Sequence, residues 1–350
     1  MKDRDHLFHR LDRRAFLKLS GLLGLGATAA TVFPSAAEAV RFNKQMMKVS
    51  KRRLAMGTFV SMTLLHPSKD QAEEAMELAF QEIERLSAVL SRYERSSAVA
   101  FLNINGQAQD LPPEVIQVVS RALQYHTLTG GAFDITVKPV VDLFRQKLGG
   151  EKKAQPAESE LRDLLKLVDA GKVELRDRSV HFMEPGMGIT LDGIAKGFIV
   201  DRTSDFLTAR GIENHLIDAG GDIRTRGEKE GEKPWTVAIQ DPLKKGRYPD
   251  VVQMKDGAIA TSGNYEVFFD QEKMFHHIVN PRTGLSPNLP SSVSVMAKTT
   301  MEADALSTGV FVMGPGEGTE FINGIPSCEC LVISRDGIQS RSRGWRSSAI

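Results

Sequence analysis

The sequence predicts an α+β fold in which largely antiparallel sheets are flanked by helices. Short runs rich in β-branched and aromatic residues recur along the chain, and amphipathic stretches with helical spacing lie among them. Strand and helix do not alternate regularly, as a doubly wound parallel fold would require, so antiparallel pairing is favoured. No internal repeat and no convincing linker divides the sequence. We therefore expect residues 40–350 to form a single domain.

Residues 1–39 have the features of an export signal. Arg13 and Arg14 precede an apolar run, and Ala37-Glu38-Ala39 has the A-x-A form of a signal-peptidase site. Paired arginines before a moderately apolar stretch are typical of a twin-arginine signal. We expect the twin-arginine export machinery as a partner, cleavage after Ala39 and a periplasmic protein. The alternative is a retained anchor, but the run from 19 to 33 is shorter than the roughly 20 residues that span a bilayer, so we expect no stable membrane span.

Composition narrows the possible partners of the remaining chain. The full sequence has a net charge of +1, and residues 1–39 carry six basic and four acidic side chains, which leaves about −1 after cleavage. A nearly neutral protein is a poor match for nucleic acid or an anionic membrane as its main partner. Cys328 and Cys330 occupy alternate positions of an expected strand, a geometry that disfavours a disulfide between them. We expect packed thiols and a fold without disulfides.

The expected elements begin with one strand over 53–66, or two strands broken at Gly57, and a helix from Lys69 to Tyr93 with one apolar stripe. A second helix follows Pro112-Pro113 and runs to the glycines at 130–131, and a third covers 161–168 after a charged loop. Another helix runs over 194–210 and ends at Gly211, and one more covers 301–313. Short strands are expected around Lys172, Val180, Ile189, His215, Ile223, Trp235, Val251, Ala258, Phe275 and Val293, with a last strand over 328–334.

One pair of oxygen-bearing side chains lies on the helix over 301–313. Asp304 and Thr308 are four residues apart and therefore share a face of that helix. A carboxylate and a hydroxyl are suitable ligands for Mg²⁺, which prefers oxygen and usually keeps waters or substrate phosphates in its shell. The spacing alone is also compatible with Asp304 acting as a helix cap.

Two adjacent histidines lie where an expected strand enters a turn. His276 and His277 face opposite sides of an extended chain, so one can be buried while the other borders a cleft. Arg282 and Thr283 follow in a Pro-Gly turn. A histidine in this position could accept a proton from an attacking hydroxyl near neutral pH. The alternative is a structural histidine bonded to the backbone.

Two glycine-containing turns could bring main-chain N–H groups close to a phosphate. They are Ala219-Gly-Gly-Asp222, between two expected strands, and Ala260-Thr-Ser-Gly-Asn264, after another. Both are also compatible with ordinary turn chemistry. The chain after residue 39 contains neither G-x-x-x-x-G-K-[ST] nor G-x-G-x-x-G, so a nucleotide would be held by a different scaffold.

In this order the motifs resemble those of the ApbE family, the FAD:protein FMN transferases. The resemblance covers most of the chain after the signal and rests on eight motifs. They are Met56-Gly-Thr58; Ser91-Arg-Tyr93 with Ser96 and Leu102-Asn103; Gly131-Ala-Phe-Asp134-Ile-Thr136 with Pro139; Asp192-Gly-Ile-Ala-Lys-Gly197 with Asp201; Asp218-Ala-Gly-Gly-Asp222; Thr261-Ser-Gly-Asn264; His277 to Gly284; and Ala303-Asp-Ala-Leu-Ser-Thr308. Each motif alone is common, but the ordered set is specific. The resemblance implies an ApbE, T-fold-like architecture.

The resemblance also implies roles for particular residues. Asp304 and Thr308 would bind Mg²⁺ with a main-chain carbonyl near Ala195, and His277 and Asp304 would be catalytic. FAD would be the substrate, bound by Met56, Tyr93, Asp134, Asp192, Lys196, Gly220, Gly221, Thr261, Ser262, Gly263 and His277.

The implied reaction is attack by a Thr or Ser hydroxyl of an acceptor flavoprotein subunit on the FMN phosphorus, with AMP as the leaving group. Two departures from the family pattern are visible. Asn280 stands where members often carry Asp, and the lipoprotein cysteine of many relatives is missing. The second departure favours a protein that is free in the periplasm. Two alternatives remain, namely a pyrophosphatase that converts FAD to FMN and AMP, and a periplasmic protein that binds FAD without cleaving it.

Overall fold

The computed structural model describes residues 38–41, 46–148, 155–229, 232–243, 248–264, 276–288 and 290–348. Most of the expected export signal, residues 1–37, lies outside this range. Strand β1 (Glu38–Arg41) pairs with β2 (Met47–Ala55) and begins two residues before the expected cleavage point. The export signal and its cleavage therefore stay predictions.

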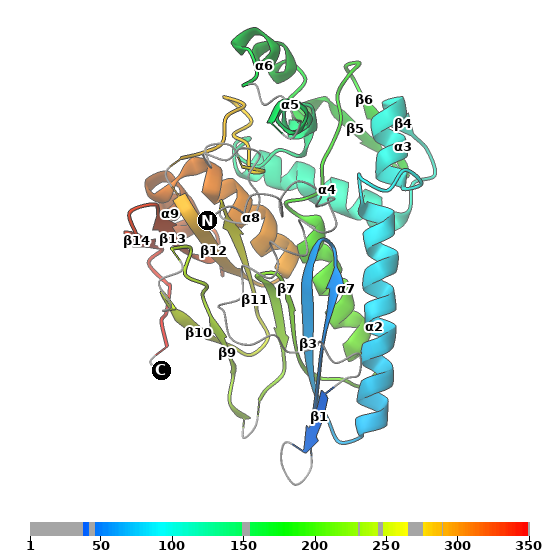
Figure 1. The fold of residues 1–350 in the computed structure, drawn as a ribbon, viewed down its shortest axis with the longest axis vertical. Helices are drawn as coiled ribbons and strands as arrows, with labels where there is room; N and C mark the ends of the chain where they lie inside the picture. The colour runs from blue at the N-terminus through cyan, green and yellow to red at the C-terminus, as the bar shows by residue number, and fades with distance from the viewer. Residues whose placement is uncertain are drawn as a thin grey trace, which may run out of the picture.

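Within the described residues, a nine-stranded sheet forms the centre of the fold (Figure 1). Its strand order is β1-β2-β3-β7-β8-β11-β12-β13-β14, and every neighbouring pair is antiparallel. The strands after β2 are β3 (Thr58–His66), β7 (Asn214–Ala219), β8 (Asp222–Arg226), β11 (Ala258–Gly263), β12 (Pro290–Ala297), β13 (Glu329–Ser334) and β14 (Gln339–Arg341). The prediction of an α+β fold with antiparallel sheets is confirmed.

Helices cover one face of this sheet and enclose the main core. They are α2 (Lys69–Leu90), α7 (Ala195–Thr208), α8 (Thr300–Met313) and α9 (Pro315–Asn323). The apolar stripe of α2, which includes Met76, Phe80, Ile83 and Leu86, is fully buried against β2 and β3. Burial of that stripe holds the helix on the sheet, because propensity alone leaves most isolated helices marginal in water.

Two smaller layers complete the fold. The hairpin of β9 (Trp235–Ala238) and β10 (Val251–Met254) joins residues of β8, β11 and β13 in a second, separate apolar cluster. A third group lies at the upper end of the molecule in Figure 1. It comprises α3 (Ala98–Asn105), β4 (Gln107–Ala108), α4 (Pro113–Leu128), η1 (Ile135–Val137), α5 (Lys138–Leu148), α6 (Glu158–Leu165), η2 (Ala170–Lys172), β5 (Val173–Arg176) and β6 (Ser179–Phe182).

The expected strand at Ile189 is wrong. The backbone there is irregular, because the side-chain amide of Asn103 accepts from Ile189 N at 2.7 Å and donates to Ile189 O at 2.9 Å. A side chain thus satisfies the groups that a neighbouring strand would otherwise bind. The helix from Lys69 ends at Leu90 rather than Tyr93, since Ser91 is extended. Phe275 lies outside the described residues.

Candidate active site

Two hairpin turns meet at one end of the central sheet. Met56 and Gly57 connect β2 to β3 with φ angles of 51° and 73°, and Gly220 and Gly221 connect β7 to β8 with 66° and 98°. Positive φ at both positions is the signature of a type I′ turn. A Cβ atom on Gly220 would lie 2.3 Å from Oγ1 of Thr58, so only glycine allows the two turns to touch.

Strand β11 brings three further expected site residues to the same end. A Cβ atom on Gly221 would lie 3.7 Å from Cβ of Thr261, so the end of β11 lies against the β7–β8 turn. Ser262 Oγ lies 2.8 Å from Ser307 Oγ and 3.3 Å from Thr308 Oγ1. Gly263 is the last residue of β11. The Thr261-Ser262-Gly263 segment therefore joins the glycine turns to helix α8.

Asp304 and Thr308 do lie one turn apart on α8, at the point where α7 crosses it. Asp304 is only 4% exposed and accepts a hydrogen bond from Gly197 N at 3.1 Å. A Cβ atom on Gly193 would lie 3.0 Å from Thr308 Oγ1. The start of α8 is capped instead by Thr299 and Asp201. Asp304 is therefore not the cap of its own helix, and it faces the beginning of α7.

The cluster contains more buried acid than base. Lys196 Nζ lies 2.9 Å from Asp222 Oδ2, and Asp222 is almost completely buried. Burial raises the pKa of Asp304 well above its usual value, and the nearby Asp222 charge raises it further, while Lys196 opposes both effects. Burial likewise raises the pKa of Asp222. Lys196 is thus the lysine that compensates the charge of two buried carboxylates, those of Asp222 and Asp304. An additional cation would stabilise this arrangement.

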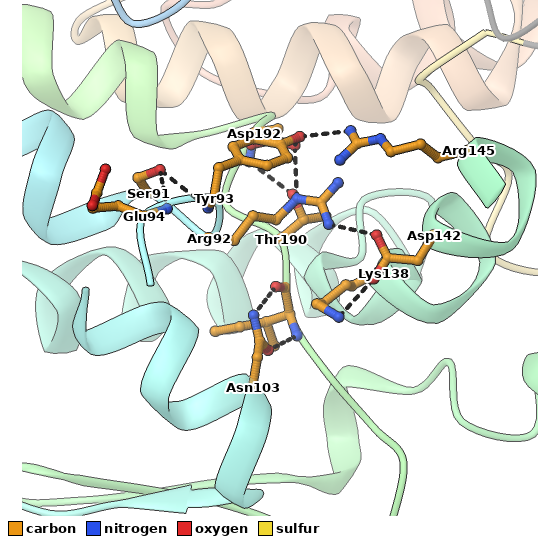
Figure 2. A network of polar contacts seen from close by, with 11 residues as sticks. Ser91, Arg92, Tyr93, Glu94, Asn103, Lys138, Asp142, Arg145, Thr190 and Asp192 are labelled. Atoms are coloured by element: carbon orange, nitrogen blue, oxygen red, sulfur yellow. Dashed lines mark hydrogen bonds and ion pairs between the residues drawn. The ribbon is translucent and has the colours of Figure 1, made fainter. Parts of the chain in front are cut away.

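Tyr93 and Asp192 form the outer part of the site (Figure 2). The Tyr93 hydroxyl donates to Asp192 Oδ2 at 3.0 Å. Asp192 precedes Gly193, which contacts Thr308, and its charge also contributes to the raised pKa of Asp304. The structure thus places Tyr93 and Asp192 at the exposed edge of the cluster that contains Asp304.

The two histidines have different surroundings, as their alternation predicted. His276 is 1% exposed, its Nε2 lies 3.0 Å from Pro287 O, and its ring packs edge-on against Phe311 of α8. His277 is half-buried. The backbone-bonded structural histidine is therefore His276. Phe311 follows Thr308 by about one turn, so the His276–His277 segment approaches α8 beside the oxygen cluster.

Asp134 and Ala195 differ in what they can offer a ligand. The Asp134 carboxylate accepts from Thr136 N at 2.7 Å and Ala170 N at 3.1 Å, and it pairs with His126 at 3.1 Å. Its side chain is thus committed to the protein, and a contact with FAD would have to come from its backbone. Ala195 is the first residue of α7, two positions before Gly197.

Arg92, Asp142 and Arg145 surround Tyr93 and Asp192, and the sequence patterns indicated no role for any of the three (Figure 2). Asp142 and Arg145 lie on α5, a helix that was not expected. Ser307, which contacts Ser262, was also missed. Only the helical spacing of the apolar residues of α5 could have indicated that helix. No local sequence pattern could have predicted that Asp142 binds Arg92, which lies 50 positions away.

The α+β fold described above is the fold of solved ApbE structures. The ApbE protein of Thermotoga maritima superposes with a TM-score of 0.76 at 29% identity, over 85% of this chain and 97% of that one. The flavin transferase ApbE of Vibrio cholerae gives a TM-score of 0.73 at 28% identity, over 88% and 98%.

Sequence comparisons agree with the structural ones. The ApbE family model matches residues 56–332. The FAD:protein FMN transferase of Treponema pallidum is 32% identical over 317 residues, which cover 83% of this chain and 86% of that protein. The corresponding protein of Haemophilus influenzae is 30% identical over 84% and 88%. The chain belongs to the ApbE family.

Proposed function

We propose that this protein is a Mg²⁺-dependent FAD:protein FMN transferase that acts in the periplasm. It attaches FMN through a phosphoester bond to a Thr or Ser of an acceptor flavoprotein subunit and releases AMP. The observation that carries the proposal is the cluster of Asp304, Thr308 and Ser262 where the glycine turns of the sheet meet α7 and α8. Curated relatives that match most of this chain are named for the same reaction.

The residues of the cluster fit a magnesium ion. No three His, Cys, Asp or Glu side chains of the described chain gather around a common point, so a site built mainly from such ligands is not present there. Mg²⁺ needs only one or two carboxylates, because substrate phosphates and water complete its shell. Asp304 and Thr308 would hold the ion with the Ala195 carbonyl, and the excess of buried carboxylate favours a cation.

The reaction needs a base, a bound pyrophosphate and a fixed acceptor. The acceptor hydroxyl attacks the FMN phosphorus, and its proton passes to the imidazole of His277. The bond between that phosphorus and the bridging oxygen breaks, and AMP leaves with the bridging oxygen. The ammonium of Lys196 provides positive charge on the phosphate side, whereas the Gly221 N–H of the glycine turn already donates to Asp218 Oδ1 at 2.9 Å. When bound, Mg²⁺ would neutralise part of the negative charge of the pyrophosphate.

The proposed location follows from the sequence of the first 39 residues. Paired arginines, the apolar run and the Ala37-Glu38-Ala39 site support twin-arginine export and cleavage. Among the described helices, none combines the length and the apolar character needed to cross a bilayer. We propose a periplasmic enzyme whose acceptors face the same compartment.

Mass spectrometry of an acceptor tests the proposal. The full chain is incubated with FAD, Mg²⁺ and a flavoprotein fragment, with a matched fragment that lacks the acceptor hydroxyl as the control. The intact fragment should gain one FMN, and AMP should appear in equal amount. Free FMN and AMP with an unmodified fragment would identify a pyrophosphatase. Bound but intact FAD would identify a carrier.

A further inference from the structure

A buried arginine lies beneath the outer part of the candidate site (Figure 2). The side chain of Arg92 is 3% exposed, and its guanidinium reaches two carboxylates. Its Nε donates to Asp192 Oδ2 at 3.2 Å, and its Nη1 donates to Asp142 Oδ1 at 2.8 Å. Asp142 also accepts from Lys138 Nζ at 2.7 Å. Arg92 therefore connects helix α5 to the loop that carries Asp192 into α7.

Tyr93 is held by the same network from two sides. Its hydroxyl donates to Asp192 and accepts from Arg145 Nη2 at 2.9 Å. The guanidinium carbons of Arg92 and Arg145 lie 4.6 and 4.9 Å from the centre of its ring. The residue is nevertheless 46% exposed. An aromatic side chain fixed at its hydroxyl and still open to solvent can present its ring to a flat ligand.

One face of α5 supplies the anchoring groups. Lys138, Asp142 and Arg145 are spaced by four and three residues, so they lie on the same side of that helix. Asp142 holds Arg92, and Arg145 holds Tyr93, so neighbouring residues of the 91–94 turn are bound to one rigid element. A planar guanidinium with donors in fixed directions is well suited to this task, whereas an ammonium fixes no plane.

The exposure of the partners indicates what Arg92 contributes. The side chains of Asp142 and Asp192 are 41% and 47% exposed. Water can therefore solvate both carboxylates when the arginine is removed, and ion pairs to such exposed groups add little to stability. The hydrogen bonds and ion pairs of Arg92 are therefore better explained by the orientation of Tyr93 and Asp192 than by stabilisation of the fold.

We propose that Arg92, held by Asp142, is a positioning residue that fixes Tyr93 and Asp192 for FAD binding. This inference rests on the proposed function, since it assigns those two residues to FAD binding. Arg92 itself lies behind them and acts through them. Removing it should weaken FAD binding and leave the chemical step almost intact, because the oxygen cluster on α8 has no hydrogen bond or ion pair to Arg92 among the described residues.

Steady-state kinetics and FAD binding on purified full-length variants test the proposal. Arg92→Met should raise KM for FAD and the FAD Kd roughly tenfold, with kcat changed less than about threefold, as expected for loss of uniform binding. Arg92→Lys should recover only part of the affinity, and Asp142→Asn should lower affinity in the same direction. The double variant Arg92→Met/Asp142→Asn should bind FAD about as weakly as Arg92→Met alone.

Arg121→Met is the matched control, because Arg121 also lies over a tyrosine ring, that of Tyr125 on α4, at 5.6 Å. This variant should bind FAD like the unaltered protein. Unchanged FAD affinity in folded Arg92→Met, or full additivity with Asp142→Asn, would overturn the inference. A fall in kcat at constant KM would do the same. Absence of FAD binding by the unaltered protein would instead overturn the proposed function.

Discussion

Replacing Gly197 by alanine should separate α7 from α8 and damage the site between them. Gly197 lies in the first turn of α7, and its N–H donates to Asp304. A Cβ atom there would lie 2.4 Å from Thr300 O, 2.6 Å from Thr300 C and 2.7 Å from Met301 Cα. All three are backbone atoms and cannot rotate away. Relief of the clash requires the helices to move apart by about 1 Å, given that unstrained contacts to carbon lie at about 3.5 Å.

That displacement sets the expected magnitudes. Overpacking of this kind costs about 1–3 kcal/mol, which exceeds the roughly 0.5–1 kcal/mol that alanine gains over glycine inside a helix. A shift of about 1 Å would lengthen the 3.1 Å bond from Gly197 N to Asp304 beyond hydrogen-bonding distance. A misplacement of about 1 Å costs on the order of 10²-fold in rate. Gly197→Ala should therefore lose both stability and turnover.

Thermal unfolding and FMN transfer to an acceptor measure the two effects. Gly316→Ala is the matched control, because Gly316 lies in the first turn of α9, a Cβ atom added to it would meet no other atom within 4 Å, and its φ is not positive. Its unfolding temperature should stay the same or rise, and its turnover should not change. If Gly197→Ala behaved like this control, the close approach of α7 and α8 would not be what positions Asp304.

Three further substitutions test separate parts of the reasoning. Asp304→Ala should retain FAD binding and lose turnover and Mg²⁺ dependence; a variant with unchanged turnover would remove Asp304 from the mechanism. His277→Ala should lower kcat by about 10²-fold or more, and a smaller loss would argue against His277 as the base. Burial lowers the pKa of His215 from 6.5 to about 4, so the unfolded chain binds more protons between these values and stability falls as pH falls through that window. His215→Gln should make the free energy of unfolding in urea at pH 5 and pH 7 more nearly equal, by about 2 kcal/mol.

Local sequence patterns predicted most reliably the helices whose apolar residues form one buried stripe. The stripe of α2 was found because apolar residues recur at the helical period and are buried there. The helix over 301–313 was also predicted, although α8 is buried on nearly every side and shows no single stripe. Helix α5 was missed although Val140 and Phe144 are buried at that spacing. Pro139 in its second position looks like a helix breaker, but a proline in the first turn removes no hydrogen bond.

The candidate site could be predicted only in part, because most of its contacts join distant segments. The spacing of Asp304 and Thr308 follows from the helical repeat, but the bond from Gly197 to Asp304 spans 107 positions. No periodicity predicts such a contact. The family resemblance supplied most of the residue roles, and it gave no role to Arg92, whose interactions depend on α5.

The two helices at the site stabilise each other's beginnings. Asp201 of α7 accepts from Thr300 N at 2.8 Å and Met301 N at 2.9 Å, while Asp304 of α8 accepts from Gly197 N. Carboxylates at helix N-termini are favoured by the helix dipole and by the free N–H groups there. This exchange offsets part of the cost of burying Asp304. It also fixes the register of α7 against α8, because all three bonds break if either helix slides. The hydrogen bonds that allow Asp304 to be buried therefore also determine where its carboxylate lies relative to α7 and Lys196.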